Sequence, residues 1–389
     1  MHTRILEHIS DIDETAWQTL WQSHYPFIQY GFLAALEQTH CVGENTGWQP
    51  LYIIAEQDGA LLGAMPLYLK NHSYGEYVFD WSWADAYHHH GLDYYPKLIN
   101  AIPFTPATGP RFAACNDEAS AALFSACLQL AESLGASGWH CLFPDMKGAS
   151  VLSANPKLTQ RLGTQFHWFN QHYKDFDDFL STFTSRKRKT IKKEREKANT
   201  HVQLVRKRGS ELTHEDWQHF FRLYQRTYLK RSGRPGYLTE AFFTQLGKVL
   251  CDQVLMVQAI SNEQCIAAAL YFYDDTTLYG RYWGAIAEFD GLHFECCYYQ
   301  GIEFAIENSL QRFDPGAQGE HKIPRGFIPV LTQSFHILIE PNFHYAICDF
   351  TAKEGTAVRE YCLDARNALP FNQAYTLDIS PDILLEETP

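Results

Sequence analysis

The chain has 389 residues, of which 46% are hydrophobic and 20% are charged, and its formal net charge at pH 7 is −13. This length favours two domains of ordinary size over one, and the composition excludes a disordered or fibrous chain. No run approaches the roughly 20 apolar residues that span a bilayer, and the first residues lack the apolar core of a signal peptide. We therefore expect a cytoplasmic protein without a membrane-spanning helix.

The cysteines and one histidine run bear on metal binding. The ten Cys are scattered and form no C-x-x-C pair, which predicts reduced thiols rather than disulfides or a zinc site. His88, His89 and His90 are consecutive, and neighbouring side chains of an extended chain point in opposite directions. We expect no metal site.

The two halves of the chain begin with the same succession of patterns. Residues 16–21 (AWQTLW) and 216–221 (DWQHFF) each open an amphipathic helix. Residues 53–69 and 257–273 then read as β-hairpins of equal length with polar turns. This correspondence at a near-constant offset predicts an internal duplication, and chance similarity between two α/β units is the alternative.

The correspondence continues beyond the hairpins. An aromatic strand is predicted at 77–84 and again at 278–285, and Gly91-Leu92 and Gly291-Leu292 each mark the start of a helix. Each half therefore reads helix, hairpin, strand, helix, strand.

The domain division follows from this repeat. We predict an N-terminal domain over residues 1–170, a C-terminal domain over 171–351 that begins with a basic helix, and a C-terminal helix and tail over 352–389. The last few residues are expected to be loosely held.

A dense basic segment stands out in an otherwise acidic chain. Residues 186–208 contain eleven Lys/Arg and two Glu, and Ile191 is the only large apolar residue between 186 and 197. This pattern predicts a solvated helix, which is either a plain surface helix or a site for an anionic partner. The candidate phosphate-binding residues encircle one turn and are Arg186, Lys187, Arg188 and Lys189.

Several strings resemble the FemAB-like proteins, which are predicted N-acyltransferases similar to the Fem peptidyltransferases of peptidoglycan biosynthesis. These strings are HSYGEYVFDW at 72–81, SRKRK at 185–189, LYGRYWG at 278–284, LHFE at 292–295 and GAQGEHK at 316–322. The resemblance implies an α/β fold of two tandem GNAT units, each a mixed twisted sheet flanked by helices. It also implies transfer of an acyl or aminoacyl group from an activated donor to the amine of a small molecule or peptide, with peptidoglycan precursors as one acceptor class.

The resemblance bears on the donor as well. GNAT enzymes that use acetyl-CoA carry R/Q-x-x-G-x-G/A between the fourth strand and its helix, where backbone N–H groups hold the pyrophosphate. The segments taken as equivalent, 88–93 and 289–294, lack that glycine spacing. Fem enzymes lack it too and use aminoacyl-tRNA. We expect no tightly bound cofactor and a co-substrate that is either aminoacyl-tRNA or acyl-CoA.

The chain contains no G-x-S-x-G elbow and no Cys in a nucleophile motif. Direct attack by an amine on an activated carbonyl then needs only a base and support for the oxyanion. The segment 316–327 offers Glu320 or His321 as base, and Lys322 or Arg325 for a phosphate or oxyanion. A polar loop before a strand is the alternative.

A second catalytic candidate is the pair His293 and Glu295 at the start of a helix. The alternative is an ordinary capped helix whose histidine is hydrogen-bonded within the fold. In the first half, Asp80, Trp81 and Trp83 suggest an acceptor cleft, with aromatic core packing as the alternative. By resemblance, further substrate-binding residues are Tyr95, Lys97, Thr105, Arg111, Arg281 and Trp283.

Two functions are consistent with these features. The first is an N-acyltransferase that acts by direct attack. The second is a non-catalytic protein that uses the twin fold and the basic segment to bind RNA, such as tRNA, or a nucleotide-linked ligand. The sequence predicts no particular oligomeric state.

Overall fold

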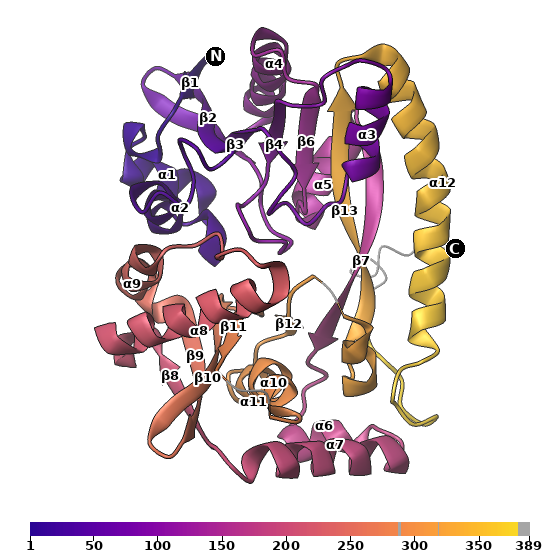
Figure 1. Ribbon diagram of the computed structural model, residues 1–389. Helices are drawn as coiled ribbons and strands as arrows, with labels where there is room; N and C mark the ends of the chain where they lie inside the picture. The colour runs from indigo at the N-terminus through magenta and orange to yellow at the C-terminus, as the bar shows by residue number, and fades with distance from the viewer. Residues whose placement is uncertain (287–288, 318, 380–389) are drawn as a thin grey trace. The chain divides into compact units, whose positions relative to one another are not determined.

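The computed structural model describes residues 1–286, 289–317 and 319–379 (Figure 1). Gln318 and the end of the tail expected to be loosely held lie outside the described residues. Contacts between Cα atoms divide the chain into two units. Unit 1 comprises Met1–Gly163 and Thr332–Val358, and unit 2 comprises the described residues of Thr164–Leu331 and residues 359–379. In the described part of the chain, no helix has the length and apolar character needed to cross a bilayer.

Unit 1 builds a mixed sheet in the order β1-β2-β3-β4-β6-β13, with the short β5 paired to β3. Its strands pair antiparallel except β4 and β6, which are parallel with Leu98 opposite Trp139. Its elements up to the unit boundary are β1 (His2–Leu6), α1 (Glu14–Trp21), α2 (Tyr30–Gln38), β2 (Trp48–Gln57), β3 (Ala60–Lys70), α3 (Trp81–His89), β4 (Lys97–Asn100), β5 (Ala113–Ala114), α4 (Asp117–Ser133), β6 (Gly138–Leu142), α5 (Met146–Ser153) and β7 (Thr159–Phe169).

Unit 2 builds a second mixed sheet in the order β8-β9-β10-β11-β12-β7. Here β11 and β12 form the parallel pair, with Leu278 opposite Phe313. The elements are α6 (Phe176–Ser181), α7 (Ser185–Asn199), β8 (Gln203–Arg208), α8 (His214–Ser232), α9 (Glu240–Val249), β9 (Val254–Ser261), β10 (Gln264–Tyr273), β11 (Thr277–Ala285), α10 (Leu292–Phe294), the π-helical turn η5 (Glu295–Tyr299), α11 (Gln300–Glu307), β12 (Arg312–Asp314) and the 3-10 segment η6 (Glu320–Arg325). The chain then enters unit 1 within β13 (Ile328–Leu338) and returns to unit 2 within α12 (Pro341–Arg366).

The two sheets repeat one plan. In each unit an edge strand precedes two helices, an antiparallel hairpin and a fourth strand follow, and a helix then leads to a fifth strand parallel to the fourth. The predicted hairpins, and the paired helices before them, are present in both units. The two halves are therefore the same α/β unit built twice, which is the element order of the GNAT fold.

The last strand of each unit comes from the other half of the chain. The end of β7 pairs with β12 through Phe169 and Arg312, whereas β13 pairs with β6 through His336 and His140. The predicted domains 1–170, 171–351 and 352–389 differ from this arrangement. Residues 332–351 belong to unit 1 because β13 completes its sheet, and α12 is a continuous helix that begins before residue 352.

The aromatic segment of the first half is not a strand, so that prediction was wrong. Residues 81–89 form α3, and Gly91 follows the end of that helix instead of starting one. Trp83 and Tyr87 are one helical turn apart and both pack into a core cluster with Leu338 and Ile347. The buried side chains recur at helical spacing, and their packing outweighs the preference of aromatic residues for strands. The segment 278–285 does form a strand, within β11.

The histidine run occupies the last turn of α3 and the residue that follows it, so the expectation of an extended chain there was also wrong. All three imidazoles are exposed.

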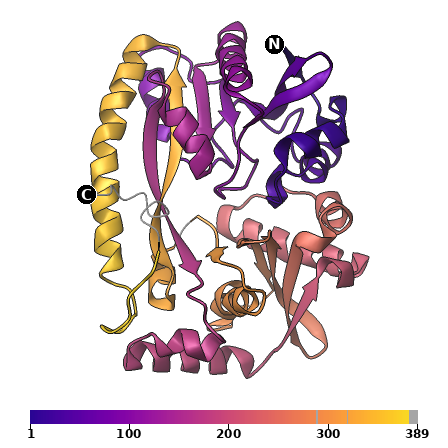
Figure 2. The ribbon, with the colours of Figure 1, turned by 180° about the vertical axis from the view of Figure 1, so that it is seen from behind.

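Helices cover both faces of the unit 1 sheet. Leu123 and Cys127 of α4 and Leu152 of α5 share a buried cluster with Leu67 and Trp139 of the strands. In Figure 2 α5 lies in front of the strands, and in Figure 1 α3 lies in front of β13. The segment between β3 and β4, residues 71–96, therefore adds a helix to the opposite face, and it carries the charged groups described next.

Candidate active-site clusters

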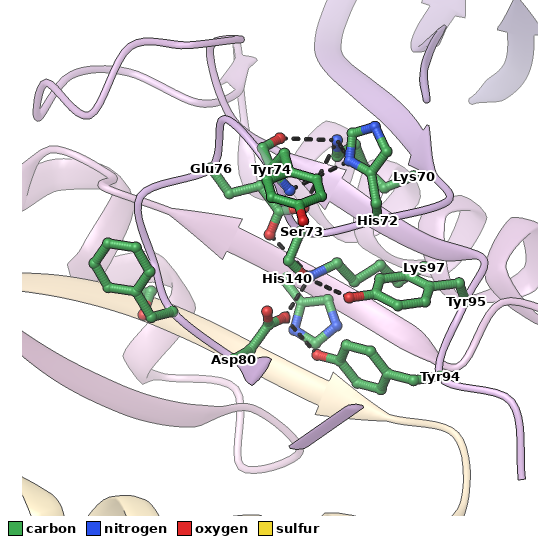
Figure 3. Close-up of polar contacts among 12 residues, drawn as sticks. Lys70, His72, Ser73, Tyr74, Glu76, Asp80, Tyr94, Tyr95, Lys97 and His140 are labelled. Carbon is green, nitrogen blue, oxygen red and sulfur yellow. Dashed lines mark hydrogen bonds and ion pairs between the residues drawn. The ribbon is translucent and has the colours of Figure 1, made fainter. Parts of the chain in front are cut away.

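Lys97 is the centre of a buried polar cluster in unit 1 (Figure 3). It lies on β4 with its side chain fully shielded from solvent. Its Nζ donates to Ser73 Oγ and to Glu76 Oε2, each at 2.8 Å, and to Asp80 Oδ2. All three acceptors come from residues 71–80, so this segment folds down onto the strand that follows it.

Lys70, at the end of β3, is a second buried ammonium in the same cluster. Its Nζ lies 3.2 Å from His72 Nδ1 and from the Tyr74 carbonyl oxygen. It also lies 3.9 Å from Glu76 Oε1 and 3.8 Å above the Trp48 ring. The lysine–carboxylate cluster comprises Lys70, Ser73, Glu76, Asp80, Tyr94, Tyr95 and Lys97.

Burial sets the charges in this cluster. It lowers the pKa of Lys70 to about 7 and raises the pKa of Glu76 to about 7. Burial also disfavours the charged forms of Lys97 and Asp80. The attraction of Glu76 and Asp80 outweighs burial for Lys97 and raises its pKa, and the attraction of Lys97 outweighs it for Asp80 and lowers the pKa of that carboxyl. Lys97 and Asp80 are thus charged at neutral pH, while Lys70 and Glu76 titrate near it.

A buried histidine pair adjoins Asp80. His140 and His336 are register partners on β6 and β13, and their Nδ1 atoms are 2.8 Å apart. Burial lowers the pKa of His140 to about 3 and that of His336 well below its usual value, so both rings are neutral. Among the described residues, neither His140 Nε2 nor Asp80 Oδ1 has a hydrogen-bond partner.

The predicted aromatic residues of unit 1 have different environments. Trp81 is 41% exposed and its ring lies 5.1 Å from that of Tyr74, which is also exposed. Trp83 is buried and packs edge-on against His336 at 4.9 Å. Trp81 can therefore meet a ligand, whereas Trp83 belongs to the core.

Of the remaining predicted residues in unit 1, only Tyr95 joins the lysine–carboxylate cluster, through a 2.8 Å contact of its hydroxyl with Ser73 Oγ. Thr105 is buried and donates to the Pro103 carbonyl. Arg111 is buried and donates to the Leu142 carbonyl at 2.6 Å and to the Ala107 carbonyl at 2.5 Å. Both residues make structural bonds to nearby backbone.

In unit 2 the polar groups gather where the parallel pair ends. β12 stops at Asp314, while β11 continues to Ala285. The Asp314 carboxylate is buried, accepts from the Gly316 N–H at 2.9 Å, and has one oxygen without a hydrogen-bond partner among the described residues.

Lys322 lies at the same place. Its Nζ donates to the Gly316 carbonyl, and Gly316 has a φ of 97°, which favours glycine. Burial lowers the pKa of Lys322 to about 8; Asp314 opposes this shift and Arg281 adds to it. The ammonium is thus close to its titration point in a buried setting.

Next to Lys322 lies the histidine–tyrosine cluster, which comprises His293, Tyr298 and His321. The Tyr298 hydroxyl is 2.8 Å from His321 Nε2, and the two imidazole rings are 6.3 Å apart. Trp283 packs against His293 at 5.4 Å. Burial, aided by neighbouring cations, lowers the pKa of His293 to about 3 and also lowers that of His321. His321 is exposed, so a substrate can reach a neutral imidazole there.

The two predicted glutamates have other partners. Glu295 is fully buried, and Arg195 donates to both of its oxygens at 3.0 and 2.8 Å. Glu320 is exposed and accepts from the Tyr361 hydroxyl at 2.6 Å. Because both oxygens of Glu295 accept hydrogen bonds from Arg195, this carboxylate is poorly suited to take a proton from a substrate. His321 remains the better candidate for the base.

The basic segment forms α7 as predicted, and its cations fall into two groups. No ion pair among the described residues engages the four predicted phosphate-binding side chains, Arg186, Lys187, Arg188 and Lys189. By contrast, Lys192 pairs with Asp177 at 2.7 Å and Lys197 pairs with Asp290 at 2.5 Å. The first turn of α7 thus carries unneutralised positive charge.

Several residues of these clusters were not singled out from the sequence. They are Lys70, Glu76, His140, His336, Tyr298 and Asp314. His140 and Asp314 could have been noticed as polar residues within apolar strand patterns. Buried polar residues are uncommon unless they are hydrogen-bonded or have a function. The others lie in segments whose pairing depends on long-range folding.

Sequence comparison agrees with this picture. The chain matches the FemAB-like family, described as peptidoglycan biosynthesis/recognition, over residues 8–373. The chain belongs to the FemAB-like family. No curated protein matches the sequence.

Solved structures share the fold of this FemAB-like protein at low sequence identity. One is FemX (14% identity, 89% of this chain and 100% of that chain, TM-score 0.53). Another is a conserved protein of unknown function from Bacteroides thetaiotaomicron (11% identity, 87% of this chain and 100% of that chain, TM-score 0.52). A third is the C-terminal domain of a putative lysylphosphatidylglycerol synthetase from Agrobacterium fabrum (9% identity, 88% of this chain and 96% of that chain, TM-score 0.52).

The predicted family and the predicted fold class, two tandem GNAT-like α/β units, are confirmed. Family and fold together support an acyltransferase function.

Proposed function

We propose that this FemAB-like protein is an N-acyltransferase in which an acceptor amine attacks the carbonyl of an activated donor directly. The observation that carries the proposal is the adjacency of His321 and Lys322 where β11 and β12 part. His321 offers a neutral, solvent-reachable imidazole that can take the amine proton. Lys322 offers a buried ammonium that can support the oxyanion or a donor phosphate.

The state of the nearby thiols supports direct attack. Burial raises the pKa of Cys296 and of Cys297, the two cysteines next to Tyr298 in sequence. A thiol with a raised pKa is a poor nucleophile because the thiolate is the reactive form. An acyl-enzyme on either cysteine is therefore disfavoured.

The starts of the two helices that follow the fourth strands argue against acyl-CoA as the donor. The helix that follows the fourth strand of unit 1 is α4, so residues 101–116, not 88–93, are the equivalent of the pyrophosphate loop. That helix begins with Asp117 and Glu118, which would repel a pyrophosphate. In unit 2, a Cβ placed on Gly291 would lie 3.2 Å from Glu194 and 3.6 Å from Ala198, so α7 packs onto the start of α10.

The first turn of α7 supports aminoacyl-tRNA as donor. Its cations lie at the positive end of a helix dipole and lack carboxylate partners among the described residues, an arrangement that a polyanion would stabilise. We assign Arg186, Lys187, Arg188 and Lys189 to contacts with tRNA phosphates.

Unit 1 is proposed to bind the acceptor. Tyr74, Phe79 and Trp81 are exposed aromatic rings beside the lysine–carboxylate cluster. Such rings suit a sugar or peptide surface. Because the family is described by peptidoglycan biosynthesis/recognition, we propose a peptidoglycan precursor that bears an amine as the acceptor.

A donor-and-acceptor matrix tests this proposal. The full chain is incubated with bulk aminoacyl-tRNA or acetyl-CoA and with amine-bearing muramyl peptides, and products are detected by mass. We expect transfer from aminoacyl-tRNA, lost in His321→Ala and kept in His214→Ala, which removes an exposed histidine of the same unit. Transfer from acetyl-CoA alone would refute the donor assignment. Binding of tRNA without transfer from any donor would favour the non-catalytic alternative.

A further inference from the structure

Two consecutive residues of α7 reach the segments that carry the histidine–tyrosine cluster. Glu194 accepts from Arg325 Nη2 at 2.5 Å and from the Tyr299 hydroxyl. Arg195 binds Glu295 through both carboxylate oxygens and Glu303 at 2.7 Å. Glu194 therefore ties α7 to η6 through Arg325 and to η5 through Tyr299, and Arg195 ties α7 to η5 and α11.

The Glu194 contact continues to His321. Arg325 Nη1 donates to the His321 carbonyl at 2.5 Å, and its guanidinium lies 3.4 Å above the Phe294 ring. The guanidinium is thus held by a carboxylate, a ring and a backbone carbonyl. Because charge-assisted hydrogen bonds are directional, the position of Glu194 fixes the backbone from which His321 projects.

The Arg195 contact reaches the partner of His321. Glu295 opens the π-helical turn, and Tyr298, whose hydroxyl contacts His321, lies in the same turn. Single π turns inside helices occur frequently at functional sites. Both residues of the hydroxyl–imidazole contact are therefore anchored to α7.

The placement of Glu194 is not explained by the helix itself. The residues three and four positions away are Ile191, Lys197, Thr190 and Ala198, and Lys197 pairs with Asp290 instead. Glu194 is one of two acids in a strongly basic helix. The other, Glu196, is exposed, and its side chain has no partner among the described residues.

We propose that Glu194 is a positioning residue for acyl transfer: it couples α7 to η6, so that a polyanion docked on the first turn of α7 stabilises the orientation of His321. This inference rests on the proposed function for the identity of the polyanion and of the base. The coupling itself depends only on contacts within unit 2. In Figure 1 α7 lies next to the α10–α11 segment, in agreement with the bonds from Arg195 to Glu295 and Glu303.

Hydrogen–deuterium exchange tests the coupling without any substrate. The turn at η6 is closed by bonds from the Lys322, Gly326 and Phe327 amides to backbone carbonyls. In the full chain, Glu194→Gln should accelerate exchange of these amides by about tenfold, the scale expected when one charge-assisted contact is weakened. Glu196→Gln should leave their exchange unchanged. Equal exchange in the wild type and Glu194→Gln would overturn the proposal.

A second arm adds deacylated bulk tRNA. In the wild type, tRNA should slow exchange in α7 and in residues 320–327. In Glu194→Gln it should slow exchange in α7 only. If tRNA slows exchange in neither segment of the wild type, the donor assignment fails, while the substrate-free result still decides the role of Glu194. If tRNA protects both segments equally in the variant, the coupling through Glu194 is refuted.

A kinetic arm separates positioning from a general structural role. Glu194→Gln should lower kcat for transfer from aminoacyl-tRNA by about tenfold and leave the KM for the acceptor unchanged, because only the orientation of the base is altered. Glu194→Asp, which retains the charge, should recover part of the loss. A raised acceptor KM with an unchanged kcat would contradict the assignment.

Discussion

The Nζ of Lys97 lies 2.8 Å from Glu76 Oε2, and solvent reaches neither side chain appreciably. This contact joins β4 to the segment that precedes α3, and Asp80 completes the ion cluster from the same segment. Removing one member of a buried ion pair leaves an uncompensated charge, and this costs more than the intact pair contributes. The cluster therefore fixes the inserted segment on the sheet of unit 1.

Lys97→Met should destabilise the protein strongly. The substitution leaves Glu76 and Asp80 buried without their central partner, and we expect a loss of about 3–5 kcal/mol in the free energy of unfolding. Lys147→Met, at an exposed lysine, should change the stability by less than about 0.5 kcal/mol. Urea denaturation followed by tryptophan fluorescence measures both values. Similar midpoints for the two variants would contradict the assigned role of Lys97.

The pH dependence of stability should carry opposite signatures of Glu76 and Lys70. The pKa of Glu76 is raised to about 7, so the folded state holds its proton more tightly and the stability from this group falls as pH rises from about 4.5 to 7. The pKa of Lys70 is lowered to about 7, so the unfolded state binds more protons and stability rises from pH 7 to about 10.5.

Variants isolate each slope. Relative to the wild type, Glu76→Gln should remove a fall of about 1.4 kcal/mol per pH unit on the acid side of pH 7, and Lys70→Met should remove a rise of similar size on the alkaline side. Urea unfolding at several pH values gives these differences. Parallel pH profiles for the wild type and Glu76→Gln would show that Glu76 is ionised in the folded protein throughout this range.

The sequence was sufficient to predict the hairpins because strand alternation and turn residues are local signals. Both hairpins and the helices before them lie where the pattern put them. It was insufficient for α3, where Trp81 and Trp83 favour a strand by composition. The helix forms because its buried positions meet β13, which lies more than two hundred residues later in the chain.

The candidate site residues could be anticipated only in part. His293 and His321 belong to two separate candidate segments in the sequence, and the structure places their rings 6.3 Å apart. The ion pair of Glu295 could not be predicted, because its partner Arg195 lies in a basic helix about one hundred residues earlier in the chain. Long-range ion pairs leave no trace in local spacing.

The rate of transfer should report on the imidazole of His321. Its pKa is lowered by burial and by Lys322 and Arg325, so the base stays neutral below the usual value of 6.5. We expect the acid limb of kcat/KM to lie below pH 6.5 and the rate to fall by about 10²-fold or more in His321→Gln. An acid limb with a midpoint above 6.5, unchanged in His321→Gln, would identify another base.

Tyr298→Phe should have a smaller effect. It removes a hydroxyl 2.8 Å from His321 Nε2 but leaves the ring in place. Loss of one hydrogen bond should lower kcat by about 3- to 10-fold. Tyr345→Phe, at a tyrosine that is 74% exposed on α12, is the matched control and should be silent. Steady-state assays with aminoacyl-tRNA measure both, and a Tyr298→Phe enzyme with full activity would remove the hydroxyl from the mechanism.

Binding of tRNA should depend on salt through the unpaired cations of α7. Arg186→Gln should reduce the slope of log K against log salt concentration by about one, since each phosphate contact contributes roughly that amount. Lys192→Gln should reduce it less because Lys192 already pairs with Asp177. Fluorescence anisotropy with labelled deacylated tRNA measures the slopes. Identical slopes for the two variants would indicate that the first turn of α7 makes no phosphate contact.

The exchange of β7 and β13 has a consequence for how the chain matures. During synthesis the N-terminal half emerges first, yet the strand that completes its sheet beside β6 is made only after nearly the whole of the second half has been translated. Until then the edge of β6 that pairs with β13 in the finished sheet, on which His140 lies, has no strand partner. The nascent first half is therefore exposed to proteases and to mispairing on the ribosome, and its final assembly depends on the synthesis of residues 328–338.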